Sequence, residues 1–483
     1  MDPSDQRALC QAALDAASSS GARYAEARYV TRERENIKIR NGAAELSNHQ
    51  QDVGIGIRVL VGNSWGYAGT NLLSQDGVAE AARRATTTAH STAGSTGIDV
   101  IIPTAVTSSY ETDVREDPFR LSQGEKLAPF VEAHERISGV EGIKVSRGNF
   151  VAHRQETMFL ASNGSDQSQR ITLCGGGVSA IAQANGDVQV RSLPKSMEGN
   201  FLQGGFEHIR AMNLPGAAEQ TAHEALALTH AERTPEGAKT IILDGCQLSL
   251  QIHESVGHPT ELDRVLGEEI SLAGSSFLLP DSRDELRYGS EHVNLTADST
   301  TPFGPGTFGF DDEGTPASRV PLVESGKLVG FLSGRDTAQR VGCTPTSALR
   351  AESWASLPIV RMVNVNLEPG TGSMDDLIAG VDDGLLLAAN KSWSIDDLRL
   401  NFQFSCEIAY EIKGGKRTGR IFKNPIYYGV TPHFWGSCSA VAGPEAWKMW
   451  GWLFCGKGDP AQLMYVGHGC APSRFDGIRV GSS

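Results

Sequence analysis

The chain contains three His-Glu dipeptides, and only the third is completed by a nearby histidine. The pairs begin at His134, His223 and His253, and the third reads His253-Glu254-Ser255-Val256-Gly257-His258, an H-E-x-x-x-H pattern. Imidazole nitrogens are common zinc ligands, and a glutamate beside one can accept a proton from water. The segment follows an apolar run, so we expect it to be held in the protein interior.

The spacing of the two histidines is unusual for a metal site. In the H-E-x-x-H motif of zinc proteases they are four residues apart, about 40° around a helix, whereas five residues give about 140°. A regular helix cannot direct both rings to one metal. Gly257 tolerates unusual dihedral angles, and Pro259 disfavours the α conformation at His258. We therefore expect the helix to end or bulge just before His258, which would turn this ring toward His253.

A third ligand must come from elsewhere in the chain, because a catalytic zinc typically has three protein ligands and an open position. The spacing alone does not choose among the candidates, which are Glu261, Asp263, Asp311-Asp312-Glu313, Cys455, His468 and Cys470. The Asp311-Asp312-Glu313 cluster could also suit a second, hard cation. A solvated turn or a hydrogen-bonding brace is the favoured interpretation of that cluster.

The elements that must position these residues divide into two halves. The periodicity predicts helices near 5–20, 74–92, 122–138 and 215–231, and strands near 35–50, 52–68, 141–152, 157–163, 168–182 and 187–193. Gly62-Asn63 is a turn signal within the second strand region. Beyond residue 236 short alternating segments dominate. We predict an α+β fold, with an N-terminal domain of strands and packed helices at 1–235 and a mainly antiparallel β domain with the metal-binding helix at 236–483.

Composition excludes several classes of protein. The chain has 483 residues with a net charge of −14, and its calculated pI is near 5.4. This surface should repel polyphosphate, so nucleic acid is not expected as a partner. No apolar stretch approaches the roughly 20 residues of a membrane span, and the first residues lack the features of a signal peptide. The eight cysteines show no close spacing, so we expect a cytoplasmic protein without a disulfide framework.

Several segments in order resemble the TldD/PmbA family of metallopeptidases. The first is LDGCQLSLQIHESVGHPTELDR, which contains the H-E-x-x-x-H pattern, and others lie along nearly the whole chain. These are DVGIGIRVLVGNSWGYAGT, FDDEGTP, VESGKLVGFLSGRDTA, RMVNVNLEPG and LFCGKGDP. TldD-type members have a cysteine in a C-G-K segment near the carboxyl terminus. The resemblance therefore implies Cys455 as the third ligand beside His253 and His258.

The resemblance also implies a function. It indicates a Zn²⁺-dependent peptidase that hydrolyses unfolded or extended peptides, in which a metal-bound water is activated by Glu254. It implies a homodimer or a heterodimer with a PmbA/TldE-type paralogue, which lacks the metal motif. The alternatives are a non-enzymatic partner or regulatory subunit and a zinc hydrolase of another class, such as an amidase. Arg350, Arg361 and Asn364 are candidates for holding the substrate backbone or for a structural role.

Overall fold

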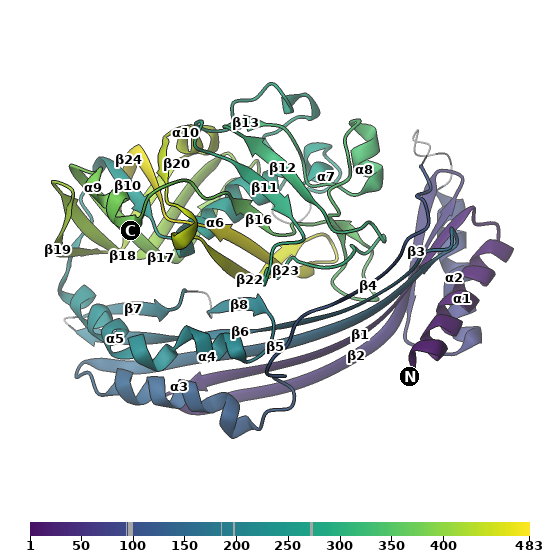
Figure 1. Cartoon of the computed structure of the whole chain (residues 1–483), viewed down its shortest axis with the longest axis horizontal. Helices are drawn as coiled ribbons and strands as arrows, with labels where there is room; N and C mark the ends of the chain where they lie inside the picture. Colours follow the sequence, from purple (N-terminus) through teal and green to yellow (C-terminus); the bar gives the residue numbers. More distant parts are fainter. Residues whose placement is uncertain (93, 95–99, 185, 197–198, 271–273) are drawn as a thin grey trace.

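The computed structural model describes residues 1–92, 94, 100–184, 186–196, 199–270 and 274–483. The N-terminal half forms a long curved sheet, and the C-terminal half lies against the inner face of this sheet (Figure 1). The helices of the N-terminal half cover its outer face. This arrangement confirms the predicted α+β fold with a β-rich C-terminal half. The predicted domain division between residues 235 and 236 stays a prediction.

The N-terminal sheet has the strand order β3-β2-β1-β5-β6-β4, and two further strands pair with β6. Its strands are β1 (Tyr24–Arg40), β2 (Ala43–Val61), β3 (Ser64–Thr70), β4 (Thr107–Glu111), β5 (Ile143–Ala161), β6 (Asp166–Ala184), β7 (Asp187–Leu193) and β8 (Asn200–Gln203). Its helices are α1 (Pro3–Ser19), α2 (Gln75–Ser91), α3 (Gln123–Ser138), α4 (Glu207–Met212) and α5 (Leu214–His230). The predicted helices agree with α1, α2, α3 and α5.

Two strand predictions were wrong. The segment predicted as one strand over 35–50 contains a tight turn, because Asn41 and Gly42 both have positive φ and separate β1 from β2. Asn-Gly favours such a two-residue hairpin turn, and this signal was missed. The strands predicted over 141–152 and 157–163 are one continuous strand, β5. The predicted turn at Gly62-Asn63 is present between β2 and β3.

Alternation along the long strands gives the sheet two different faces. Side chains such as Ile37 of β1 and Phe150 of β5 pack under α3 and α5 in an apolar layer. The opposite face carries polar side chains such as Arg28, Asn149 and Gln169, and it faces the C-terminal half. Because residues i and i+2 of a strand share a face, the alternation of residues along each strand determines which side chains lie on the apolar face and which on the polar face.

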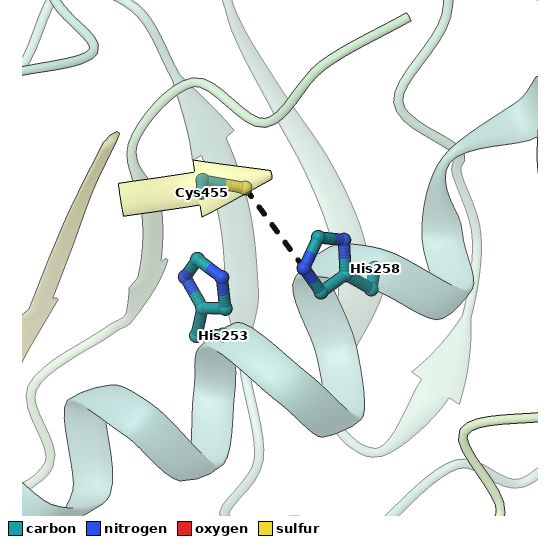
Figure 2. Close-up of side chains that lie close together, drawn as sticks. All are labelled: His253, His258 and Cys455. Atoms are coloured by element: carbon teal, nitrogen blue, oxygen red, sulfur yellow. Dashed lines mark hydrogen bonds between the residues drawn. The ribbon is translucent and has the colours of Figure 1, made fainter. Parts of the chain in front are cut away.

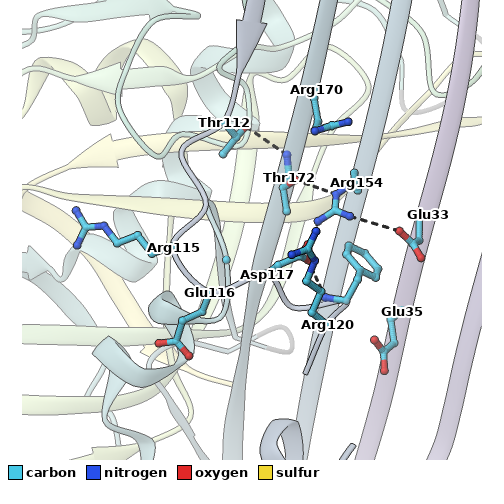
Figure 3. Close-up of polar contacts among 12 residues, drawn as sticks. Glu33, Glu35, Thr112, Arg115, Glu116, Asp117, Arg120, Arg154, Arg170 and Thr172 are labelled. Carbon is cyan, nitrogen blue, oxygen red and sulfur yellow. Dashed lines mark hydrogen bonds and ion pairs between the residues drawn. The ribbon is translucent and has the colours of Figure 1, made fainter. Parts of the chain in front are cut away.

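An ion-pair network anchors the segment that leads from β4 into α3. Figure 3 shows Asp117 of this segment beside Arg154, which is directed toward Glu33. The Arg154 guanidinium lies 2.6 Å from Asp117 and 3.7 Å from Glu33, and Glu116 pairs with Arg210 of α4 at 2.8 Å. These pairs join the segment before α3 to the outer face of the sheet and to α4.

The C-terminal half is built around a closed barrel. The barrel strands follow the order β17-β10-β24-β20-β18, and β18 pairs with β17 again. All of these pairs are antiparallel except β10–β17. The strands of this half are β9 (Glu232–Arg233), β10 (Gly237–Leu243), β11 (Leu295–Asp298), β12 (Arg319–Glu324), β13 (Lys327–Leu328), β14 (Leu349–Arg350), β15 (Ile359–Val360), β16 (Val365–Leu367), β17 (Asp383–Ile395), β18 (Asn401–Lys413), β19 (Lys416–Lys423), β20 (Pro425–Val430), β21 (Cys438–Val441), β22 (Lys448–Lys457), β23 (Gln462–Cys470) and β24 (Ser473–Ser482).

Short helices complete this half and carry the candidate site. They are α6 (Gly245–Ile252), α7 (Leu262–Val265), α8 (Arg335–Arg340), α9 (Met374–Ala379) and α10 (Thr431–Gly436), with 3₁₀ turns at His258–Thr260, Pro280–Ser282 and Pro444–Ala446. Every residue of α6 is buried, which confirms that the histidine segment is held in the interior. None of the helices in the described part of the chain combines the length and the apolar character that a membrane crossing requires.

Candidate metal centre

The two histidines are brought together by a widened helical turn. The Asp244 side chain caps the start of α6 by accepting a hydrogen bond from the Gln247 amide at 2.7 Å. After Ile252 the helix continues as a π-helical turn over His253–Gly257, and the amide of His258 donates to the carbonyl of His253. In i→i+5 bonding, residues five apart are stacked on one face. The ring centres of His253 and His258 are 4.8 Å apart as a result.

The predicted reason for this geometry was wrong in detail. Gly257 has φ −56° and ψ −62°, and His258 has φ −63° and ψ −45°, so both residues remain in the right-handed helical region. The helix bulges, as expected, but without unusual dihedral angles. Gly257 is needed for space, because a Cβ at this position would collide with the sulfur of Met362. Pro259 then lies in the 3₁₀ turn that follows.

Cys455 reaches the same space from a distant part of the chain. It lies on β22, next to a register shift between Trp452 and Cys455 in the β22–β23 hairpin. Its Sγ is 3.9 Å from Nε2 of His258, and Figure 2 shows the sulfur close to both rings. One potential ligand atom from each of His253, His258 and Cys455 lies within 4.8 Å of the others. The three side chains are buried.

His468 orients the first ring. Its Nδ1 lies 3.0 Å from the carbonyl oxygen of Val365, and its Nε2 lies 2.8 Å from Nδ1 of His253. A carbonyl oxygen only accepts, so His468 donates from Nδ1 and accepts at Nε2 from His253. The Nε2 lone pair of His253 is then available to a metal.

Glu261 orients the second ring. Its Oε2 lies 3.1 Å from Nδ1 of His258, which leaves Nε2 of that ring as the atom facing Cys455. Burial alone would raise the pKa of Glu261, but Lys457 and Arg264 hold it well below its usual range. Arg264 donates to Oε2 at 2.8 Å, and Lys457 lies 3.4 Å away. Carboxylates of this kind fix the ring orientation of metal-binding histidines.

The protonation states suit a divalent cation. Burial lowers the pKa of His253 to about 4 and also lowers the pKa of His258, so both rings are neutral at pH 7. Burial raises the pKa of the Cys455 thiol, but His258 and Arg361 lower it by more, and it lies below its usual value. Metal ligands must be neutral imidazoles and thiolates. The donor set therefore fits zinc, which binds nitrogen and sulfur ligands.

Glu254 lies beside this donor set and has its own partner. It directly follows His253 and is buried, and its Oε2 accepts a hydrogen bond from Arg399 at 2.7 Å. Arg399 has a positive φ of 63° and is held through its carbonyl by the Thr431 hydroxyl at 2.8 Å. Arg399 was not predicted as a site residue, because no sequence motif contains it.

The other candidate ligands have different roles. Asp263 accepts from Lys457 at 2.7 Å, and the Cys470 thiol donates to the Gly245 carbonyl at 3.2 Å. Asp312 pairs with Arg28 of β1 at 2.7 Å, and Glu313 pairs with Arg58 of β2 at 3.5 Å. The acidic cluster is therefore a buried brace between the sheet and the C-terminal half, and it is not the solvated turn considered above.

The three candidates for holding substrate contact the protein backbone instead. Arg361 donates to the carbonyls of Cys455 and Gln462 and thereby fixes the hairpin that carries the thiol. Arg350 donates to the Met362 carbonyl at 2.6 Å, and Asn364 donates to the Asp298 carbonyl at 2.8 Å. The structural role is the one that the contacts favour.

Comparison with known proteins places the chain in a family. Three family models match it in order: the PmbA/TldA metallopeptidase domain 1 at residues 25–89, the central domain at 116–229 and the C-terminal domain at 236–482. The chain belongs to the PmbA/TldD metallopeptidase family. The matched domains are described as metallopeptidase domains and the relatives are named metalloproteases, so the chain is a metallopeptidase of that family.

The relatives of this PmbA/TldD member include archaeal metalloproteases. One from Methanocaldococcus jannaschii is 29% identical over 82% of this chain and 84% of its own length. Another, from Methanothermobacter thermautotrophicus, is 30% identical over 81% of this chain and 82% of its own length. A protein of Saccharolobus solfataricus named zinc metalloprotease TldD homolog is 22% identical over 83% of this chain and 84% of its own length.

Solved structures share the PmbA/TldD fold. A candidate modulator of DNA gyrase from Bacteroides thetaiotaomicron has a TM-score of 0.74 at 16% identity, covering 99% of both chains. TldE from Thermococcus kodakarensis has a TM-score of 0.70 at 15% identity, covering 98% of this chain and 99% of its own. At these identities the similarity shows the fold alone.

Proposed function

We propose that this chain is a zinc-dependent peptidase that hydrolyses peptide bonds in unfolded or extended peptides. The observation that carries the proposal is the convergence of His253, His258 and Cys455, with ligand atoms within 4.8 Å of one another, next in sequence to the buried Glu254. The name of the S. solfataricus relative supports zinc as the metal. Zinc, when bound, supplies a Lewis acid that polarises a carbonyl and lowers the pKa of a water molecule.

The protein's own residues provide the remaining chemistry. His468 and Glu261 hold the two imidazoles with Nε2 directed toward the cation. Glu254 is positioned to accept a proton from the attacking water and to pass it to the leaving amine. Arg399 holds one carboxylate oxygen of Glu254 and so fixes its direction.

Unfolded peptides are the proposed substrates because of the β-rich surroundings. An extended peptide can bind a strand edge through main-chain hydrogen bonds, which a folded substrate cannot offer. A cavity of about 200 Å³ also opens beside the hairpin that carries Cys455, and its lining combines apolar side chains such as Leu453 and Phe454 with charged ones such as Arg34 and Glu352. Such a lining suits an unfolded chain, which exposes both apolar and polar groups.

The proposed assembly is a homodimer or a heterodimer with a PmbA/TldE-type paralogue. TldE, whose fold this chain shares, supports the second form. Light scattering of the purified chain, alone and mixed with a co-encoded paralogue, measures which form exists. The non-enzymatic alternative is disfavoured, because the relatives are named metalloproteases.

Glu254→Gln tests the function. We expect cleavage of an unstructured peptide to fall by about 10²–10⁴-fold, the usual contribution of a general base, while zinc content stays unchanged. Glu285→Gln, on an exposed glutamate of the same half, is the matched control and should retain full activity. Unchanged cleavage by the Glu254 variant would exclude this residue from the mechanism.

A further inference from the structure

A second cavity lies on the N-terminal sheet. Its volume is about 460 Å³. It is lined by Lys38, Ile39, Arg40, Glu45, Arg147, Gly148, Asn149, Gly177, Val178, Ser179, Ser192, Lys195 and Gly199. These residues come from β1, β2, β5, β6 and β7 and from the segment that follows β7.

The lining is strongly basic. Lys38, Arg40, Arg147 and Lys195 contribute four positive charges, and Glu45 is the one carboxylate among the described lining residues. Glu45 is already paired with Arg40 at 3.4 Å. Such a concentration of one sign of charge in a concave site attracts an anionic group.

Lys195 is a buried cation without an acidic partner among the described residues. Only 1% of its surface is exposed, and its Nζ lies 3.5 Å from the carbonyl oxygen of Ser196. Burial lowers the pKa of Lys195 to about 8, so the ammonium remains mostly protonated at pH 7. Buried charges are normally paired, and no carboxylate of the described residues pairs with this one.

Asn149 adds an unsatisfied amide to the same cavity. Its side chain is 4% exposed, and neither Nδ2 nor Oδ1 has a hydrogen-bond partner. Buried amides are almost always hydrogen-bonded, so an amide without a protein partner at a cavity is available to a ligand. The amide offers both a donor and an acceptor, and the lysine offers only donors.

Trp452 links this cavity to the candidate metal centre. The Lys195 ammonium lies 3.5 Å from the centre of the Trp452 ring, and this ring lies 6.3 Å from the ring of His253. Lys195 Nζ is therefore no more than about 10 Å from the His253 ring. An extended peptide covers this distance with about three residues, at 3.3–3.6 Å each.

We infer that this cavity binds a carboxylate of the peptide substrate, held by the ammonium of Lys195 and the side-chain amide of Asn149. The inference rests on the proposed peptidase function, and it names the feature of the peptide that is recognised. The carboxylate can be the free carboxyl end of a peptide or an Asp or Glu side chain. Its place in the fold predicts a cut about three residues before this carboxylate.

Binding is measured by calorimetry on the zinc-loaded Glu254→Gln protein, so that no turnover is needed. Three N-acetylated tetrapeptides of apolar sequence serve as probes: one with a free carboxyl end, its carboxamide, and a carboxamide that ends in Glu. We expect the free acid, the Glu peptide or both to bind about tenfold or more tightly than the plain carboxamide, because a charge-assisted hydrogen bond is gained. The ratio between the two acidic probes identifies the source of the carboxylate.

Lys195→Met, added to the same background, should abolish the preference for a carboxylate, whereas Lys195→Arg should restore part of it. Asn149→Ala is a second, milder variant, which should weaken the acidic probes alone. Lys416→Met, on an exposed lysine of the C-terminal half, is the control. Thermal unfolding confirms that each variant is folded.

Equal binding of all three probes, or an undiminished preference in folded Lys195→Met, would overturn the inference. Failure of the peptidase proposal would appear separately, as an absence of cleavage by the wild-type enzyme while the preference in binding persists. With active enzyme, mass spectrometry of cleaved longer peptides should place the cut about three residues before the carboxylate.

Discussion

Arg399 fixes the direction of the Glu254 carboxylate. Arg399 donates to this carboxylate at 2.7 Å, and both side chains are buried. A proton acceptor contributes to catalysis only when it lies within hydrogen-bond reach of the proton that it removes. At the residue scale, we therefore expect Arg399, which lies outside the H-E-x-x-x-H motif, to affect turnover.

Arg399→Gln is expected to lower kcat about 10–100-fold with little change in zinc content, since second-sphere partners commonly have effects of this size. Peptide cleavage and metal analysis on the same sample measure the two quantities. Arg136→Gln, which removes an exposed ion pair with Glu132 on α3, is the control. A normal kcat in the Arg399 variant would show that Glu254 holds its position without it.

At the element scale, the site depends on one bulge in a buried helix. The π-helical turn His253–Gly257 stacks two histidines that a regular helix would direct apart. The turn is packed against Met362, and this contact leaves no room for a side chain at Gly257.

Gly257→Ala should therefore destabilise the fold by about 1–3 kcal/mol, the usual cost of overpacking, and should weaken zinc binding. The double variant Gly257→Ala with Met362→Ala should recover part of the zinc affinity, because the colliding side chain is gone. Chemical denaturation and zinc titration measure both effects. Gly436→Ala, where nothing lies near the added methyl, should be neutral, and an equally neutral Gly257→Ala would refute the packing explanation.

Much of this element was predictable from sequence, and the rest depended on distant packing. The interior position of α6 followed from its apolar run, and Cys455 followed from the resemblance of its C-G-K segment. The structure brings these side chains together. The roles of His468 and Glu261 did not follow, because both were weighed as ligands, and only their contacts with the other ring nitrogen distinguish orientation from ligation.

At the scale of the whole molecule, a buried polar layer joins the two halves. Arg28 and Arg58 on the inner face of the sheet pair with Asp312 and Glu313, and Arg335 pairs with Glu313 at 3.1 Å. The sequence could not reveal this layer, since each charged residue reads as solvent-exposed until the opposite surface is known. The continuous length of β5 was likewise hidden, because the polar run His153-Arg154-Gln155-Glu156 interrupts its apolar residues.

Asp312→Ala should reduce the free energy of unfolding by about 3–5 kcal/mol, because Arg28 is left as an uncompensated buried charge. The double variant Arg28→Met with Asp312→Ala should be less destabilised than the single one. Zinc content should be unchanged in both, as measured on the folded proteins. A loss of one metal equivalent in Asp312→Ala would instead support a second cation site at the acidic cluster.

The most direct test of the account is anomalous diffraction at the zinc absorption edge from crystals of the protein purified without added chelator. We expect one strong peak at bonding distance from Nε2 of His253, Nε2 of His258 and Sγ of Cys455. A metal bound at other side chains, with Cys455 uncoordinated, would contradict the central claim.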